Sequence, residues 1–334
     1  MNGKKMADLI KLTSLGKSFS QKNRPPITIL RDINLTIGKS ETLCVLGESG
    51  CGKTTLGKII AGLSSYTSGS YSFNDKEVGM LKGKAWREFR KSVQLIHQNP
   101  YDSLNPALMT FDIIANPIKR HEKITKIADL YERVSQLLEL VGLTPVEDFV
   151  DKYPNALSGG QRQRVSIARV LTMNPKAIVV DEATSMIDTS LRVSLLRTLR
   201  DIQKKMGVSY FFITHDLALG KFFASGQKVM IMYLGRIVEE AFTNDLVESP
   251  AHPYTRAVIS AAVGSSDILE RTIIEKYTLH GTDIPSFSRI PSGCPLHPRC
   301  PEMMPGECDR ILPDLYDLGN GHRAACLLVK KEKI

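Results

Sequence analysis

Residues 47–54 read Gly47-Glu48-Ser49-Gly50-Cys51-Gly52-Lys53-Thr54, and this stretch decides the fold. It matches the pattern G-x-x-x-x-G-K-[ST] between an apolar run, Thr42 to Leu46, and a helix-like run, Leu56 to Ala61. Glycines let a loop turn its backbone N–H groups inward around phosphate, and the following helix adds the positive end of its dipole. The alternative is a glycine-rich turn with an exposed lysine, but the full match in strand, loop and helix order favours a phosphate-binding loop.

The residue types in this loop predict separate contacts with a nucleotide. Lys53 is expected to contact the β- and γ-phosphates, and the Thr54 hydroxyl is expected to bind Mg²⁺. The expected nucleotide-binding residues of the loop are Gly47, Ser49, Gly50, Cys51, Gly52, Lys53, Thr54 and Thr55.

A second apolar run, residues 177–182, ends in two adjacent acids, Asp181 and Glu182. A carboxylate at the carboxyl end of a parallel strand can hold Mg²⁺, which is the role expected of Asp181. Glu182 points to the other side of the strand, where it would orient and deprotonate the attacking water. The alternative is a polar strand end at the surface, which is less favoured in a chain that carries a phosphate loop.

The rest of the chain indicates an α/β fold with a helical insertion. Its 334 residues, with 42% hydrophobic, 24% charged and a net charge of +9, are typical of a globular protein of about two domains. Short β-rich runs alternate with helical stretches from Ile27 to about Glu240, which predicts a mainly parallel sheet. The strands stop between Pro100 and Lys152, where Ile127, Leu130, Val134, Leu137 and Leu138 recur at helical spacing.

Composition divides the chain near residue 263. We expect a nucleotide-binding domain over 1–262, with a helical subdomain at about 100–160, and a separate small irregular module over 263–334, rich in proline and cysteine. No apolar run approaches the roughly 18 residues that span a bilayer, and residues 1–12 do not resemble a secretory signal. The expected compartment is therefore the cytosol.

The segment Leu157-Ser158-Gly159-Gly160-Gln161 begins an amphipathic helix. Its serine, two exposed N–H groups and helix dipole make an anion site that lacks a lysine of its own. With this segment the chain resembles the ATP-binding subunits of ABC transporters, whose signature is LSGGQ. The resemblance implies an ABC-type nucleotide-binding fold with an antiparallel β subdomain. It also implies head-to-tail dimers in which Ser158, Gly159, Gly160 and Gln161 contact the ATP held by the partner.

The same resemblance assigns four further residues. Gln98 matches the glutamine that senses Mg²⁺ and the attacking water, and His215 matches the switch histidine that contacts the γ-phosphate. Asp188 lies at the loop that crosses between subunits, where this chain has Met186-Ile187 and the family more often has Ala-Leu. Phe19 matches the aromatic residue that stacks on adenine. Taken alone, Gln98 would be a loop amide, His215 a strand-capping histidine and Phe19 a packing aromatic.

A narrower resemblance covers nearly the whole chain. Residues 98–106, 252–255 and 293–295 are similar to ATPase subunits of dipeptide, oligopeptide and nickel importers. This implies an ATP-hydrolysing subunit on the cytoplasmic face of the membrane, with a second related ATPase, two transmembrane permeases and, indirectly, an extracytoplasmic solute-binding protein. The alternative is a soluble ABC-type ATPase acting on nucleic acid or the ribosome. Such proteins usually carry a long coiled-coil insertion or two cassettes, neither of which this sequence shows, so no nucleic-acid partner is expected.

Four cysteines gather in the C-terminal module, namely Cys294, Cys300, Cys308 and Cys326. The C-x₂-C pairs typical of zinc ribbons are missing, and a cytosolic setting disfavours disulfides. Four thiolates in a loop-rich module suit a [4Fe–4S] cluster. The resemblance to peptide-importer subunits, which carry four cysteines at matching places, implies such a cluster in some of them. Zinc and four buried free thiols remain as alternatives.

Overall fold

The fold centres on an eight-stranded sheet whose middle strands run parallel. The computed structural model describes residues 8–99, 103–184, 187–263 and 277–332. The strand order is β11-β12-β10-β9-β3-β8-β7-β6, and the five strands from β9 to β6 are parallel. In chain order, the bounds are β3 (Thr42–Leu46), β6 (Val93–Ile96), β7 (Ala177–Asp181), β8 (Ser209–Thr214), β9 (Lys228–Tyr233), β10 (Arg236–Phe242), β11 (Tyr316–Gly319) and β12 (His322–Ala324). Strands β3 and β7 are buried along their whole length, as their unbroken apolar sequences predict.

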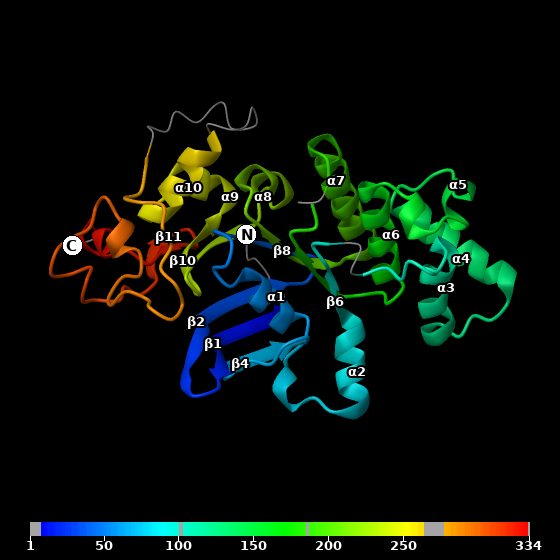
Figure 1. The fold of residues 1–334 in the computed structure, drawn as a ribbon, viewed down its shortest axis with the longest axis horizontal. Helices are drawn as coiled ribbons and strands as arrows, with labels where there is room; N and C mark the ends of the chain where they lie inside the picture. The colour runs from blue at the N-terminus through cyan, green and yellow to red at the C-terminus, as the bar shows by residue number, and fades with distance from the viewer. Residues whose placement is uncertain (1–7, 100–102, 185–186, 264–276, 333–334) are drawn as a thin grey trace, which may run out of the picture.

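A second, antiparallel sheet covers one face of the first. Its order is β2-β1-β4-β5, with bounds β1 (Asp8–Gln21), β2 (Arg24–Gly38), β4 (Ser68–Phe73) and β5 (Lys76–Glu77). Helix α1 (Lys53–Ile60) packs between the two sheets, because its Leu56, Ile59 and Ile60 belong to the apolar cluster that joins them (Figure 1). The start of α1 is thereby held rigidly at the end of β3.

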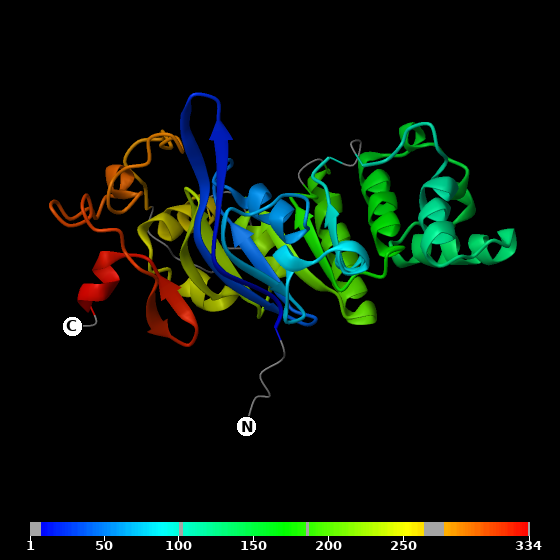
Figure 2. The same cartoon turned by 90° about the horizontal axis from the view of Figure 1, so that it is seen from below.

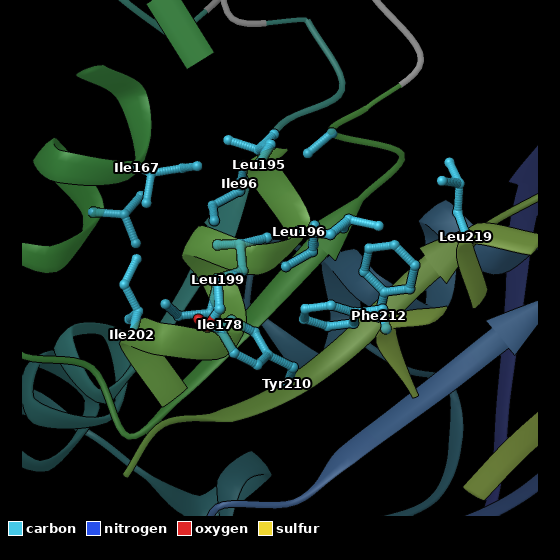
Figure 3. Close-up of a cluster of buried hydrophobic side chains, with 14 of the residues drawn as sticks. Ile96, Ile167, Ile178, Leu195, Leu196, Leu199, Ile202, Tyr210, Phe212 and Leu219 are labelled. Carbon is cyan, nitrogen blue, oxygen red and sulfur yellow. Dashed lines mark hydrogen bonds between the residues drawn. The ribbon is translucent and has the colours of Figure 1, made fainter. Parts of the chain in front are cut away.

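Helices cover the opposite face of the large sheet. Figure 3 shows Leu195, Leu196, Leu199 and Ile202 of α7 (Thr189–Met206) packed over the β7 and β8 side chains Ile178, Tyr210 and Phe212. All of these side chains are at most 1% exposed, and together they form one core cluster. Helix α8 (Leu217–Phe223) extends this layer beside β3.

The predicted helical insertion forms one end of the molecule (Figure 2). It comprises α3 (Thr110–His121), α4 (Ile127–Leu140), α5 (Glu147–Val150) and α6 (Gly159–Leu171), and it follows α2 (Gly83–Ser92) and β6. Leu130, Val134, Leu137 and Leu138 are buried as their spacing predicts. Ile127 is 68% exposed, so the prediction that it shares this face is wrong. It is the first residue of α4, and the buried face begins only at Leu130.

The C-terminal segment lies at the other end and joins the large sheet (Figure 1). After α9 (Thr243–Glu248) and α10 (Pro253–Val263), the chain is loop-rich until β12 pairs with β10, with Glu239 opposite Ala324. His322 Nε2 lies 2.7 Å from Glu239 Oε1, and α11 (Leu327–Glu332) ends the described chain. The expectation of a wholly irregular module is therefore wrong for residues 316–332, whose strands are too short to show a periodic pattern. Among the described helices, none combines the length and apolarity needed to cross a bilayer.

Candidate nucleotide-hydrolysing site

The predicted phosphate loop connects the buried end of β3 to α1. A Cβ atom added at Gly47 would lie 2.2 Å from the Met232 carbonyl oxygen, so only glycine fits this close approach. Gly52, which precedes α1, has a φ of 109°, in the region that favours glycine. Lys53 is 4% exposed, and its Nζ donates hydrogen bonds to the Gly47 and Glu48 carbonyl oxygens at 2.7 and 2.9 Å. Two hydrogen bonds to backbone carbonyls therefore hold the Lys53 side chain against the phosphate loop.

Thr54 and Asp181 meet beside this loop. The Thr54 hydroxyl donates to Asp181 Oδ1 at 3.1 Å, and Asp181 is 7% exposed at the end of β7. Burial raises the pKa of Asp181, while the Thr54 hydrogen bond acts in the opposite direction. A hydroxyl and a carboxylate oxygen are ligands that Mg²⁺ accepts, so these residues fit the metal predicted from the sequence.

Two predicted catalytic side chains, Gln98 and His215, converge on one carboxylate oxygen of the third, Glu182. Gln98 Nε2 donates to Glu182 Oε2 at 3.2 Å, and His215 Nδ1 lies 3.2 Å from the same oxygen. The three residues follow β6, β7 and β8, whose carboxyl ends meet at one edge of the sheet. Glu182 has a φ of 46°, because the chain turns sharply as it leaves β7. The Glu182 side chain is only 14% exposed, whereas that of His215 is 53% exposed.

The LSGGQ segment forms a capped helix start. Ser158 Oγ accepts from the Gln161 N–H at 3.3 Å, and Gln161 Oε1 accepts from the Ser158 N–H at 2.9 Å, which is a capping box at the start of α6. A sequence in which serine is followed three residues later by glutamine predicts this arrangement. Residues 158–161, all in the described part of the chain, are absent from the lining of the cavity beside the phosphate loop.

That cavity, of about 460 Å³, collects most of the predicted cis residues. Its lining comprises Phe19, Ile29, Ser49, Gly50, Gly52, Lys53, Thr54, Thr55, Gln98, Glu182 and Phe287. Phe19 is 45% exposed and carries Lys17 Nζ 4.7 Å from the centre of its ring. Asp188 is exposed just before α7, outside this cavity, and the preceding Met186 lies outside the described residues.

Comparisons with known proteins identify the family of this chain. Residues 30–185 match the family model described as ABC transporter, and residues 238–308 match the oligopeptide/dipeptide transporter C-terminal region. The chain is 37% identical over 324 residues to a probable peptide ABC transporter ATP-binding protein of Sinorhizobium fredii, covering 95% of this chain and 89% of that protein. The chain belongs to the family of ABC transporter ATP-binding proteins.

Two further comparisons extend the family assignment. An oligopeptide transport ATP-binding protein of Haemophilus influenzae is 36% identical over 329 residues, which cover 96% of this chain and 97% of that protein. The solved structure of a dimeric ATP-binding cassette, bound to ADP and Pi after hydrolysis, superposes with a TM-score of 0.62 at 25% identity. It covers 70% of this chain and 98% of that one. The α/β fold predicted from the sequence is therefore confirmed, and the protein is an ATPase that couples ATP hydrolysis to transport.

In this ABC ATPase, the C-terminal segment contacts the phosphate loop, an interaction that the sequence does not predict. Arg299 is 7% exposed and donates from both terminal nitrogens to the Glu48 carboxylate, at 3.1 Å each. Its Nη1 also lies 3.4 Å from the Tyr233 hydroxyl, and the Tyr254 hydroxyl accepts from the Glu48 N–H at 2.9 Å. Burial alone would lower the pKa of Arg299, but the hydrogen bonds to Glu48 and Tyr233 outweigh burial and raise it. No local pattern links residues 251 positions apart.

Replacing Arg299 with Ala is expected to weaken ATP binding by roughly three- to tenfold. The change leaves the Glu48 carboxylate without its countercharge beside the loop that receives phosphates, so triphosphates are repelled. Isothermal titration with MgATP and with magnesium tripolyphosphate should show equal losses, which shrink at high salt. The double variant Arg299→Ala with Glu48→Gln should recover the affinity. A loss that the second change does not repair would contradict the electrostatic explanation.

The four cysteines of the C-terminal segment line one small enclosed cavity, together with His252 and His297. All four are free thiols, and burial raises the pKa of Cys294 to about 11 and of Cys300 to about 12. In the described ranges, no group of three or more His, Cys, Asp or Glu side chains is arranged to hold a metal ion.

Proposed function

We propose that this ATPase powers a peptide importer and hydrolyses ATP at the seam between two ATPase subunits. The observation that carries the proposal is the division of the site within one chain. Gln98, Glu182 and most of the phosphate loop line one cavity, and Asp181 and His215 contact its lining residues Thr54 and Glu182. The capped turn at Ser158 does not line this cavity. An anion-binding turn outside the chain's own site has a purpose if it faces the nucleotide of a partner.

The contacts within the site support a separate role for each of its residues. Thr54 and Asp181 would hold Mg²⁺, which when bound neutralises phosphate charge. Glu182 accepts the proton of the attacking water, while Gln98 and His215 hold its carboxylate in place from two neighbouring strand ends. Lys53 leaves its loop carbonyls for the β- and γ-phosphates. Phe19 stacks on adenine, and Asp188 serves the crossing between subunits.

The names of the relatives support a proposal about the partners of this chain. The two curated relatives reported above are named for peptide and oligopeptide transport, and the solved cassette is described as dimeric. We infer that this chain pairs with a second, related ATPase and docks on two permeases at the cytoplasmic face of the membrane, with a solute-binding protein delivering cargo from outside. The alternative of a soluble ATPase acting on nucleic acid finds no support in these relatives.

Copurification tests this assignment. Tagged protein extracted in mild detergent is expected to retain two permeases and a second ATPase, and the retained complex should hydrolyse ATP faster when solute-binding protein and peptide are added. The complex should survive nuclease and high salt. Recovery of nucleic acid in an association that nuclease or salt abolishes would instead support the soluble alternative.

We also propose that the four gathered cysteines bind a [4Fe–4S] cluster. Four cysteine thiolates are the donor set of such clusters. The common cavity and the free state of all four thiols support this proposal.

Protein purified without oxygen is expected to be brown, with broad visible absorbance that a Cys300→Ser variant loses. Cys44→Ala is the matched control, because Cys44 is buried on β3, outside this cavity, and its loss should leave the colour unchanged. A colourless protein with stoichiometric zinc, or with no metal at all, would contradict the cluster.

A further inference from the structure

The nucleotide cavity is polar on one side of the phosphate loop and apolar on the other. The loop follows β3, while Gln98 and Glu182 follow β6 and β7, which lie to one side of β3 in the sheet. Strand β9 lies on the other side, and the turn after it reaches the loop, since the Gly235 N–H donates to the Cys51 carbonyl at 2.9 Å. The apolar lining gathers near this second turn.

Three side chains make the apolar lining, and one of them belongs to the C-terminal segment. Phe19 comes from β1, Ile29 from β2 and Phe287 from the loop beyond α10. A Cβ atom built on Gly235 would lie 3.3 Å from the Phe287 ring and 2.0 Å from the Ile29 carbonyl oxygen. Phe287 therefore lies against the same turn that contacts the phosphate loop, about 240 positions earlier in the chain.

Phe287 is held there by its own turn. The Arg289 N–H donates to the Ser286 carbonyl at 2.9 Å, and the hydroxyls of Ser286 and Ser288 lie 2.8 Å apart. The Phe287 side chain is half-buried and faces the cavity. A bound nucleoside triphosphate has matching polarity, with phosphates at the loop, the γ-phosphate toward Glu182 and a flat apolar base at the far end.

We propose that Phe287 is a nucleotide-binding residue that contacts the adenine ring together with Phe19. The C-terminal segment thereby completes the base site of its own chain, in addition to holding the phosphate loop through Arg299. Base contact with an aromatic ring contributes substantially to affinity and depends little on phosphate charge. Loss of Phe287 should consequently affect binding of the base, whereas loss of Arg299 should affect binding of the phosphates.

Isothermal titration of the full chain with two probes separates these contacts. Phe287→Ala is expected to weaken MgATP binding by about five- to tenfold and to leave magnesium tripolyphosphate binding unchanged, because that probe has no base. Phe287→Tyr should restore ATP affinity. Ile284→Ala is the matched control, since Ile284 is 43% exposed on the same loop and does not line the cavity. In contrast, Arg299→Ala should weaken both probes equally.

Wild-type ATP affinity in Phe287→Ala would overturn the proposal, and so would an equal loss for both probes, which would indicate a displaced phosphate loop. A second variant covers the case in which Phe287→Ala does not fold. Phe287→Trp in a Trp86→Phe background places the only tryptophan at the base site. ATP should quench its fluorescence and tripolyphosphate should not, whereas no quenching by saturating ATP would overturn the proposal.

Discussion

Glu182→Gln is expected to leave ATP bound but to slow its hydrolysis at least about tenfold. The amide has nearly the same size as the carboxylate and can still accept from Gln98, whose Nε2 lies 3.2 Å from Glu182 Oε2. An amide does not take the proton of the attacking water, so the site should stall after ATP binds. Phosphate release and size-exclusion chromatography with MgATP should show low turnover together with accumulated dimer.

Asp181→Asn provides the comparison for this prediction. Asp181 is adjacent in sequence, but it bonds to Thr54 rather than to Gln98 or His215. Its loss should weaken binding of MgATP, with no accumulated dimer, because the predicted metal ligand is lost. Undiminished turnover in Glu182→Gln would remove Glu182 as the base, and identical behaviour of the two variants would remove the division of roles between the two acids.

Ser158→Arg is the second change with a large expected effect. The isolated chain should bind ATP with unchanged affinity, because residues 158–161 do not line its own nucleotide cavity. Hydrolysis by the assembled transporter should fall at least about tenfold, since a bulky side chain blocks the anion-binding turn and removes a hydroxyl donor from it. Titration of the isolated chain and phosphate release by the complex measure the two effects separately.

Ser158→Thr controls for damage to the helix. Threonine keeps the hydroxyl that caps α6. Loss of such a cap destabilises a protein by about 1 kcal/mol. The Ser158→Thr transporter should therefore hydrolyse ATP at nearly the rate of the unaltered protein. A thermal melt of Ser158→Arg shows whether loss of the cap has destabilised the chain. Loss of ATP affinity in the isolated Ser158→Arg chain would place the turn in its own site and contradict the shared seam.

Local chemistry explains which parts of the fold the sequence predicts. Strand β3, the phosphate loop and α1 follow each other within 19 residues, from Thr42 to Ile60, and each has a distinctive pattern. The convergence of Gln98, Glu182 and His215 is also predictable, because each follows a strand of one parallel sheet. The capping box at Ser158 is readable from four consecutive residues.

Contacts between distant segments escape this kind of prediction. Arg299 and Phe287 stand in a proline-rich loop whose composition indicates only irregular structure, and nothing near them in sequence identifies Glu48 or Gly235 as neighbours. The pairing of β12 with β10 escapes prediction for another reason. Three residues are too few for an alternating pattern, so the register is set by tertiary contacts such as that between His322 and Glu239.

The pairing of β12 with β10 also determines where the chain can be truncated. Strand β10 has five consecutive buried residues, and β12 occupies the side of it that faces away from β9. A chain cut after α10 would leave a row of backbone N–H and C=O groups unpaired on a strand that is otherwise buried, and such an edge is a template for self-association. In the full chain the edge of the sheet is β11, which has four residues with alternating exposed side chains. Such a short edge strand is less prone to self-association. The last hairpin is therefore protection against aggregation, and assays of the isolated subunit require it.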